Sequence, residues 1–286
     1  MEMFMKKQLR IDLALAGALL AMFLLAWAMP AGAQAANAGN RITVPLSHPS
    51  QPATLRVSTI QGSITVRAYS GNQVIVATSG GHMRREHHVP PEAQGMHQLN
   101  TNPGITASED NNVVTVSTSV FNGSQNLDIE VPVHTSLRIS TVNGDLIEID
   151  GVQGDISAEN TNGNVKLENV SGSIVASALN GRVTAVITHL DENKPSSFNT
   201  MNGTIDLTLP ANVHADLRLK TAHGSIYMDN GFQFLPTPSP EPEGHRGENG
   251  MFRVQVDRSI RGTLNGGGPE VRVQNFNGDI YIHKGQ

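Results

Sequence analysis

The sequence predicts an all-β protein folded as a β-solenoid, similar in form to a parallel β-helix, with short strands and Asn-Gly corners. Two observations predict it: a recurring unit of apolar–x–Gly–x–(Ile/Val/Leu)–x–apolar residues, and nine Asn-Gly dipeptides in a chain of 286 residues. Apolar residues two positions apart are typical of a half-buried strand, and the Gly marks a turn. Strands and corners that repeat in this way stack coil upon coil around a common core.

The repeat is most regular in the middle of the chain, where glycines follow one another every nine residues from Gly154 to Gly181. Nine residues are too few for a helical crossover between parallel strands. A full coil is two such units long or slightly longer, counted between the successive corners Gly144, Gly163, Gly181, Gly203 and Gly224. One inward stack is expected from the apolar positions Ile156, Val165, Ile174 and Val183.

The corners explain the many Asn-Gly pairs, because both residues tolerate the positive φ that a tight corner requires. Asn side chains at equivalent corners are also expected to hydrogen-bond along the stack, as in the ladders of cross-β structures. The alternative is a row of Asn presented to a ligand. We favour the structural interpretation because it also accounts for the glycines.

The N-terminus has the pattern of a secretory signal peptide over residues 1–33. A basic flank precedes an apolar run over residues 13–29, and small residues follow Pro30. Cleavage is expected after Ala33 or Ala35, each of which ends an Ala-x-Ala site. The alternative is an uncleaved signal anchor. Both interpretations predict export to the periplasm, the cell surface or the medium.

The remainder is expected to contain two parts, an N-terminal β capping region over residues 41–120 and a β-solenoid domain over 126–286. The capping region is expected to hold a long polar loop over 80–112. A Pro-rich loop is expected near 235–250, because closely spaced prolines favour extended, solvated chain. Strands of the capping region are predicted near residues 54–58, 63–68, 73–78 and 113–119.

Composition excludes several kinds of site. With 20 Lys and Arg against 25 Asp and Glu, the chain lacks the basic excess of a phosphate-neutralising nucleic-acid binder. The absence of Cys excludes disulfides, thiolate zinc sites, iron–sulfur clusters and Cys nucleophiles. The expected partner is an envelope or extracellular glycan or protein. Membrane contact is expected only through an uncleaved N-terminal segment.

No metal or cofactor is expected. The strongest metal candidate is a His-rich stretch, but its adjacent histidines point to opposite faces of an extended chain and no His-Glu-x-x-His pattern is present. We therefore interpret it as a solvated loop. A calcium-binding nonapeptide is also excluded, because Gly266–Gly268 lacks the required Asp. The residues of the His-rich candidate are His82, Glu86, His87, His88 and His97.

Carbohydrate cleavage requires two carboxylates at a defined separation. Four aspartates fall near Gly corners, but other copies of the repeat place Ser, Thr, Asn or Arg in the same slot, so the slot requires only a polar residue. We therefore predict no catalytic residue and a protein that is not an enzyme. The four aspartates are Asp145, Asp155, Asp206 and Asp279.

Three phrases carry a family resemblance: VPVHTSLRISTVNGDL, SSFNTMNGTIDLTLP and RGTLNGGGPEVRVQNFNGDIYI. They resemble the bacterial putative-adhesin family, a domain of unknown function with Thr-x-Asn-Gly-(Asp/Ser)-Ile repeats. That family is similar to the β-helical head domains of putative auto-transporter adhesins. The resemblance covers residues 126–284, with a weaker echo at 54–78. It implies an exported, repetitive β-fold and no catalytic residue.

These observations predict an exported, non-catalytic cell-envelope protein that acts as an adhesin-like binding or structural module. Two alternatives stay open. One is a secreted carbohydrate-active enzyme on a β-helix, and the other is an envelope regulatory or sensor protein that binds another protein.

Overall fold

The computed structural model describes residues 41–80, 105–118, 125–238, 243–246, 252–255 and 259–285. Contacts between Cα atoms divide the chain into residues 1–38 and residues 39–286. All residues that the structure describes belong to the second unit. The predicted signal peptide lies outside the described residues, as do most of the predicted polar loop and part of the Pro-rich loop. In the described ranges, no helix has the length and apolar composition needed to cross a bilayer.

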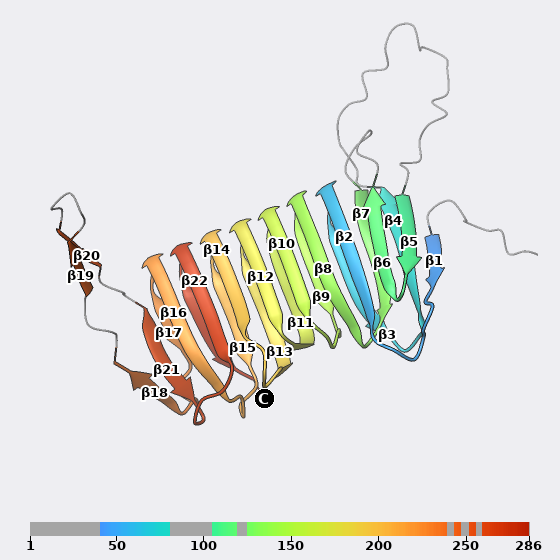
Figure 1. Cartoon of the computed structure of the whole chain (residues 1–286). Coiled ribbons are helices and arrows are strands. Elements are labelled where there is room, and N and C mark those ends of the chain that lie inside the picture. Colours follow the sequence, from blue (N-terminus) through green and yellow to red (C-terminus); the bar gives the residue numbers. More distant parts are fainter. Residues whose placement is uncertain are drawn as a thin grey trace, which may run out of the picture. The chain divides into compact units, whose positions relative to one another are not determined.

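Every regular element in these ranges is a β-strand (Figure 1), which confirms the all-β prediction. One sheet has eleven strands in the spatial order β18 (Phe234–Thr237), β21 (Ile260–Leu264), β16 (Ala215–His223), β22 (Glu270–Asn277), β14 (Ser196–Asn202), β12 (Ile174–Asn180), β10 (Ile156–Asn162), β8 (Thr135–Asn143), β2 (Ala53–Gln61), β6 (Val113–Thr118) and β5 (Ile105–Asp110). The other has ten, in the order β1 (Arg41–Pro45), β4 (Gln73–Gly80), β7 (Gln125–Pro132), β3 (Ile64–Tyr69), β9 (Leu146–Asp150), β11 (Asn164–Gly172), β13 (Val183–Leu190), β15 (Ile205–Leu209), β23 (Ile280–Lys284) and β17 (Ile226–Met228). A separate pair is formed by β19 (Glu243–Arg246) and β20 (Phe252–Gln255).

From β8 to β17, consecutive strands alternate between the two large sheets. From β8 to β13, each strand pairs in parallel with the strand two positions further along the chain, as β10 does with β12 and β11 with β13. Ile156 lies beside Ile174, two nine-residue units further on, and Ala176 lies beside Phe198, slightly more than two units further on. These offsets agree with the length of a full coil expected from the glycine spacing.

The hydrophobic core lies between the two large sheets, because alternate side chains of each strand point inward. Ile156, Val165, Ile174 and Val183 are all at most 1% exposed, as expected. They form two rows, however, and not the single stack that was predicted. Ile156 and Ile174 are neighbours in one sheet, and Val165 and Val183 in the other. Successive nine-residue units fall in opposite sheets, so neighbouring strands of one sheet are two units apart in the chain.

The order of strands departs from the order of the chain near residues 270–284. Strand β22 lies between β14 and β16, and β23 lies between β15 and β17. Gly278 consequently stands between Gly203 and Gly224, which the sequence analysis had counted as consecutive corners. All corners carry the same motif, so spacing along the chain does not reveal this insertion.

At the other end, β2 and β3 lie beside β8 and β9, while β6 and β7 lie beyond them. The strands predicted near 54–58, 63–68, 73–78 and 113–119 correspond to β2, β3, β4 and β6. The predicted polar loop over 80–112 is wrong at its end, where β5 forms because Ile105 and Ala107 pack against the core. Strands β2 and β3 pair in parallel with the central strands, while β1, β4 and β5 add antiparallel pairs at the ends of the sheets. Antiparallel strands β21 and β18 extend the eleven-stranded sheet beyond β16.

Candidate binding surface

The outward face of the eleven-stranded sheet carries side chains in parallel rows. Seven strands that lie side by side run in the same direction, and their pairing places equivalent residues next to one another. The outermost row, here called the apolar row, consists of the residues that directly precede the corners. It contains, in spatial order, Ile60, Val142, Thr161, Leu179, Met201, Phe276 and Ala222.

Five members of the apolar row are large and between 44% and 47% exposed. Single exposed apolar side chains are common on protein surfaces, whereas contiguous ones are typical of interaction sites. The apolar row is interrupted only by Thr161 between Val142 and Leu179. The face therefore offers a continuous apolar strip over β12, β14 and β22, the strands of Leu179, Met201 and Phe276.

An asparagine ladder runs directly beside the apolar row. Each member after the first, Asn143, donates its side-chain N–H to Oδ1 of the preceding one at 2.9 Å. These bonds confirm the ladder predicted from the Asn-Gly pairs. Its members are Asn143, Asn162, Asn180, Asn202 and Asn277, and the equivalent positions at its two ends are Gln61 and His223.

A second polar row lies buried beneath the ladder, and the sequence analysis did not identify it. Asn160, Thr200 and Asn275 donate side-chain hydrogen bonds to the carbonyl oxygens of Gly144, Gly181 and Gly203 at 2.8–2.9 Å. Thr221, which is only partly buried, donates in the same way to the Gly278 carbonyl at 3.0 Å. Burying a polar group requires such a partner, so these residues fix the corners in place. The Thr of the Thr-x-Asn-Gly phrase was the available signal.

The corner glycines stack on one another so closely that a side chain would not fit. A Cβ atom on Gly181 would overlap the carbonyl oxygen of Gly163, and one on Gly203 would overlap that of Gly181. Gly203 also has a φ of +157°, which disfavours other residues. The ladder, the buried polar row and the stacked glycines therefore hold the apolar row on a rigid edge.

A groove crosses four strands of this face and is called here the face groove. Its volume is about 420 Å³. Ala178, Thr200 and Asn275 belong to its floor. One wall is apolar and consists of Leu179, Met201, Phe276 and Ala222, and the other is polar and consists of Ser177, Asn199, Gln274 and Lys220.

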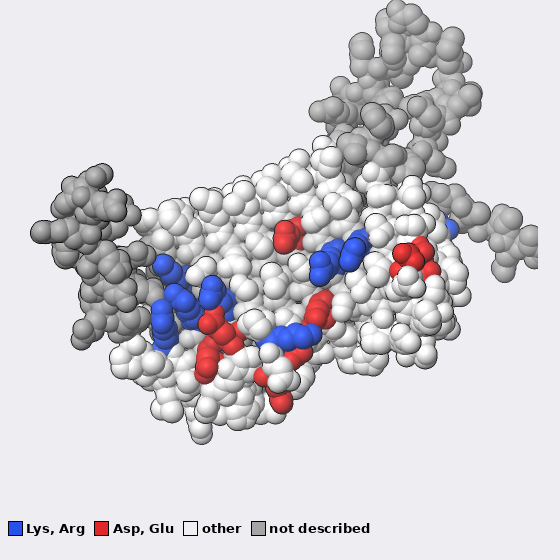
Figure 2. Space-filling view, in the orientation of Figure 1, with Lys and Arg blue, Asp and Glu red and all other residues white. Residues whose placement is uncertain are grey.

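Basic side chains lie next to the polar wall. Arg272, Arg218 and Arg261 occupy equivalent positions on the adjacent strands β22, β16 and β21. Arg272 forms an ion pair with Glu270 at 2.7 Å. Figure 2 shows one group of Lys and Arg over β16 and β22, with Asp and Glu beside it, and another over β2 and β8. Arg56 and Arg138 occupy equivalent positions on β2 and β8.

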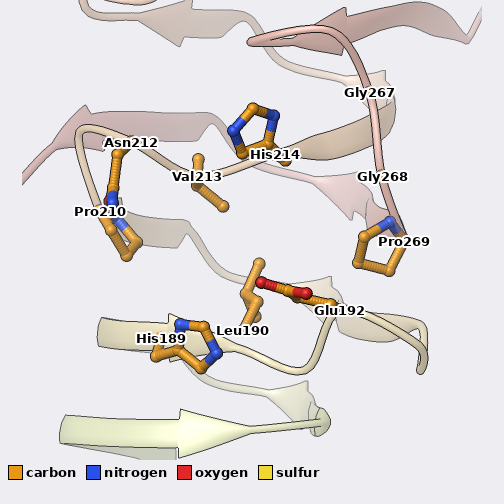
Figure 3. A pocket seen from close by; sticks show the side chains of 10 residues that line it. All are labelled: His189, Leu190, Glu192, Pro210, Asn212, Val213, His214, Gly267, Gly268 and Pro269. Carbon is orange, nitrogen blue, oxygen red and sulfur yellow. The ribbon is translucent and has the colours of Figure 1, made fainter.

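A second hollow, of about 430 Å³, lies at the opposite corner, where β16 skips a position in the sheet (Figure 3). His189 reaches it from the end of β13, Glu192 from the segment between β13 and β14, and His214 from the segment before β16. Gly267, Gly268 and Pro269 line its far side. Two hydrogen bonds join the chain around β16 to the segment before β22. The Asn265 side chain donates to the Val213 carbonyl at 2.7 Å, and the Asp216 N–H donates to the Pro269 carbonyl at 3.1 Å.

This hollow contains donors and acceptors, but its His and Glu side chains are exposed. Across the parts of the chain that the structure describes, no three His, Cys, Asp or Glu side chains are placed to hold a metal ion. The metal candidates His82, Glu86, His87, His88 and His97 lie outside those parts. Gly266 and Gly267, weighed for calcium, form a turn with φ of +93° and +87°.

The aspartates weighed for catalysis are distributed over both sheets. Asp206 and Asp279 come together in the ten-stranded sheet, where Tyr281 pairs with Asp206 and donates its hydroxyl hydrogen bond to Asp279 at 3.2 Å. That bond raises the pKa of Tyr281. Tyr281 also stacks on Tyr227, with ring centroids 5.4 Å apart.

The other two aspartates lie elsewhere. Asp155 precedes a strand of the eleven-stranded sheet and pairs with Lys194 at 2.9 Å. This hydrogen-bonded contact raises the pKa of Lys194. Asp145 precedes β9 of the ten-stranded sheet, and its carbonyl accepts the Asn164 N–H at 3.1 Å. The structure thus brings together only two of the four aspartates, Asp206 and Asp279.

Solved structures that are similar to this chain include the following two. One is a putative cell adhesion protein from Clostridium sporogenes ATCC 15579, with 10% identity, a TM-score of 0.40, and coverage of 86% of this chain and 99% of that one. The other is a putative adhesin from Bacteroides fragilis NCTC 9343, with 8% identity, a TM-score of 0.26, and coverage of 85% and 95%. No family model and no curated protein matches the chain. The specific family inferred from the sequence stays a prediction.

Proposed function

We propose that this chain is an exported, non-catalytic, adhesin-like module of the cell envelope, and that it binds through the outward face of the eleven-stranded sheet. In this proposal the two large sheets wind as a β-solenoid, in which each coil contributes one strand to each sheet. The alternation of strands between the sheets supports it, as does the offset of β10 and β12 by two repeat units.

The observation that carries the proposal is the exposed apolar row on a rigid edge. The part of a large apolar side chain that stays in water does not contribute to folding, whereas covering it with a partner is favourable by about 25 cal/mol per Å². The hydrogen bonds beneath the row hold its residues in a fixed arrangement before any partner arrives. Such preorganisation reduces the entropy lost on binding.

The experiment is a sedimentation assay of the purified protein with envelope fragments of the producing bacterium. We expect the wild type to sediment with the fragments and the double variant Met201→Ser/Phe276→Ser to remain in solution. Val175→Ser is the matched control, since Val175 is 39% exposed on the same face but lies outside the apolar row. Equal sedimentation of the double variant and the wild type would contradict the proposal.

A carbohydrate-active enzyme is the second candidate, and the proximity of Asp206 and Asp279 is the observation that favours it. Two carboxylates near each other are the minimum for glycoside hydrolysis. The triple variant Asp155→Asn/Asp206→Asn/Asp279→Asn tests this, with release of reducing ends from polysaccharides as the readout. Turnover by the wild type that the triple variant abolishes would establish the enzyme and overturn the non-catalytic proposal.

A further inference from the structure

We propose that the face groove binds an acidic polysaccharide, a glycan with carboxylates on its sugar rings. This inference rests on the proposed function and specifies the ligand of the same face. Three kinds of side chain carry it: the apolar wall, the polar wall and the arginines beside the polar wall.

The two walls of the groove match the two kinds of surface that a sugar ring presents. A pyranose ring has an apolar face of C–H groups, which packs against aromatic and aliphatic side chains such as Phe276, Met201 and Leu179. Its hydroxyl groups donate and accept hydrogen bonds. The amides of Asn199 and Gln274 do the same, so they match hydroxyls better than a group that only donates or only accepts.

The third feature is the positive charge beside the polar wall. Lys220 lines the groove, and Arg272, Arg218 and Arg261 occupy equivalent positions on three adjacent strands. Like charges directly opposite one another on paired strands are destabilising, so the fold does not require this arrangement. Guanidinium groups bind carboxylates through paired hydrogen bonds. The acidic residues Glu270 and Asp216 lie in the next row on β22 and β16, and Glu270 is ion-paired with Arg272. The four basic side chains outnumber these two acidic ones, in contrast to the net charge of −5 of the whole chain.

The shape of the groove favours a long polymer over a compact ligand. It crosses β12, β14, β22 and β16, and strands in a sheet are about 4.8 Å apart. Equivalent side chains therefore repeat at a short, regular interval along the groove. A lipid chain is disfavoured, because one wall is polar and the large apolar residues of the other are nearly half exposed.

The test is calorimetric titration of the full chain with oligogalacturonate, and with the same oligomer after methyl esterification of its carboxylates. We expect binding of the acid form that weakens as salt is added, and affinity for the ester at least about tenfold lower. The variants Arg272→Gln and Phe276→Ser should each weaken binding of the acid form by about tenfold or more. Arg138→Gln is the matched control, because Arg138 occupies the same row far from the groove.

Four results would overturn the inference. Equal affinity for acid and ester would remove the role of charge, and an equal loss in Arg138→Gln would remove the groove as its location. Equal affinity for poly-glutamate would replace the glycan by an acidic peptide. No binding of oligogalacturonate, with envelope sedimentation still abolished in Met201→Ser/Phe276→Ser, would reject this ligand and leave the proposed function intact. Urea midpoints show whether each variant is folded.

Discussion

Asn180 donates a side-chain hydrogen bond to Oδ1 of Asn162 over 2.9 Å, although the two residues are 18 positions apart in the chain. Asn180 also accepts one from Asn202 at the same distance. Each inner asparagine therefore links the two strands that flank its own strand in the sheet. The ladder joins the corners of the stack in addition to the backbone bonds of the sheet.

The first prediction concerns this ladder. Replacing Asn180 by Ala removes two hydrogen bonds, and we expect a loss of about 1 kcal/mol in the free energy of unfolding, measured by urea denaturation. Asn143 stands at the end of the ladder and accepts one such bond, from Asn162. Asn143→Ala should cost less than Asn180→Ala, and equal losses would show that the ladder does not act as a connected row.

The second prediction separates steric overlap from backbone conformation at two glycines. A Cβ atom on Gly181 would overlap the carbonyl of Gly163, so we expect Gly181→Ala to cost about 3 kcal/mol, as overpacking does. Gly266 has a φ of +93°, but no atom lies within 4 Å of the place that a methyl group would take, so Gly266→Ala should cost only about 1 kcal/mol. Urea denaturation measures both losses. The reverse order of the two would contradict the stacking of the glycines.

The third prediction concerns acid sensitivity at the β5–β6 turn. The Glu109 carboxylate accepts hydrogen bonds from the Asn112 N–H at 2.8 Å and from the N–H and hydroxyl of Ser47 at 3.1 and 2.9 Å. These bonds lower the pKa of Glu109 from its usual 4.5. A pKa lowered by folding stabilises the protein above the unfolded value, and this contribution is lost as the pH falls through the folded value.

We therefore expect Glu109→Gln to be less stable than the wild type at neutral pH. The difference between their urea midpoints should shrink as the pH falls below 4.5, the unfolded value. Asp110→Asn on the same strand is the control, since it removes a carboxylate without touching these hydrogen bonds. A difference that stays constant from neutral to acid pH would contradict the role assigned to the carboxylate.

The fourth prediction concerns export. Mass spectrometry of the protein isolated from its native host should find an N-terminus near Gln34 or Ala36, because cleavage is expected after Ala33 or Ala35. Recovery of the chain with residues 1–33 attached, in the cytoplasmic fraction, would contradict the export proposal.

Most strands and corners could be predicted from the sequence because each repeat has the same alternation of apolar and polar residues and the same Gly at the turn. Val165 and Ile174 are buried as the alternation required, and Asn162 and Asn180 bond as their spacing suggested. The position of β22 could not be predicted in this way. Strand β22 ends at Asn277 and is followed by Gly278, so its corner fits beside any other Asn-Gly corner. Tertiary packing therefore decides the position of β22 in the sheet.

The apolar row was hidden for a related physical reason. The repeat occurs at two kinds of corner, those that follow strands of the eleven-stranded sheet and those that follow strands of the ten-stranded sheet. Its first residue is mostly apolar at both, so the sequence does not distinguish them. In the structure, Val152 and Val170 occupy this slot at one corner and are fully buried, whereas Leu179 and Met201 occupy it at the other and are 44% and 46% exposed. The two corners differ in backbone path, which a one-dimensional motif does not record.

The position of β22 and β23 has a consequence for biogenesis. The ribosome makes β14 to β17 before residues 270–284, so the final order of both sheets is complete only after β22 and β23 have been made. A chain interrupted before residue 270 would lack a layer from its interior, and unpaired backbone would flank the gap on both sides. A frayed strand at the edge of a sheet leaves the other strands paired, whereas a missing interior strand would expose unpaired backbone to proteases. Residues 270–284, which are made last, thus complete the interior of both sheets. Fragments that lack these residues are expected to be cleaved by proteases more readily than the full chain.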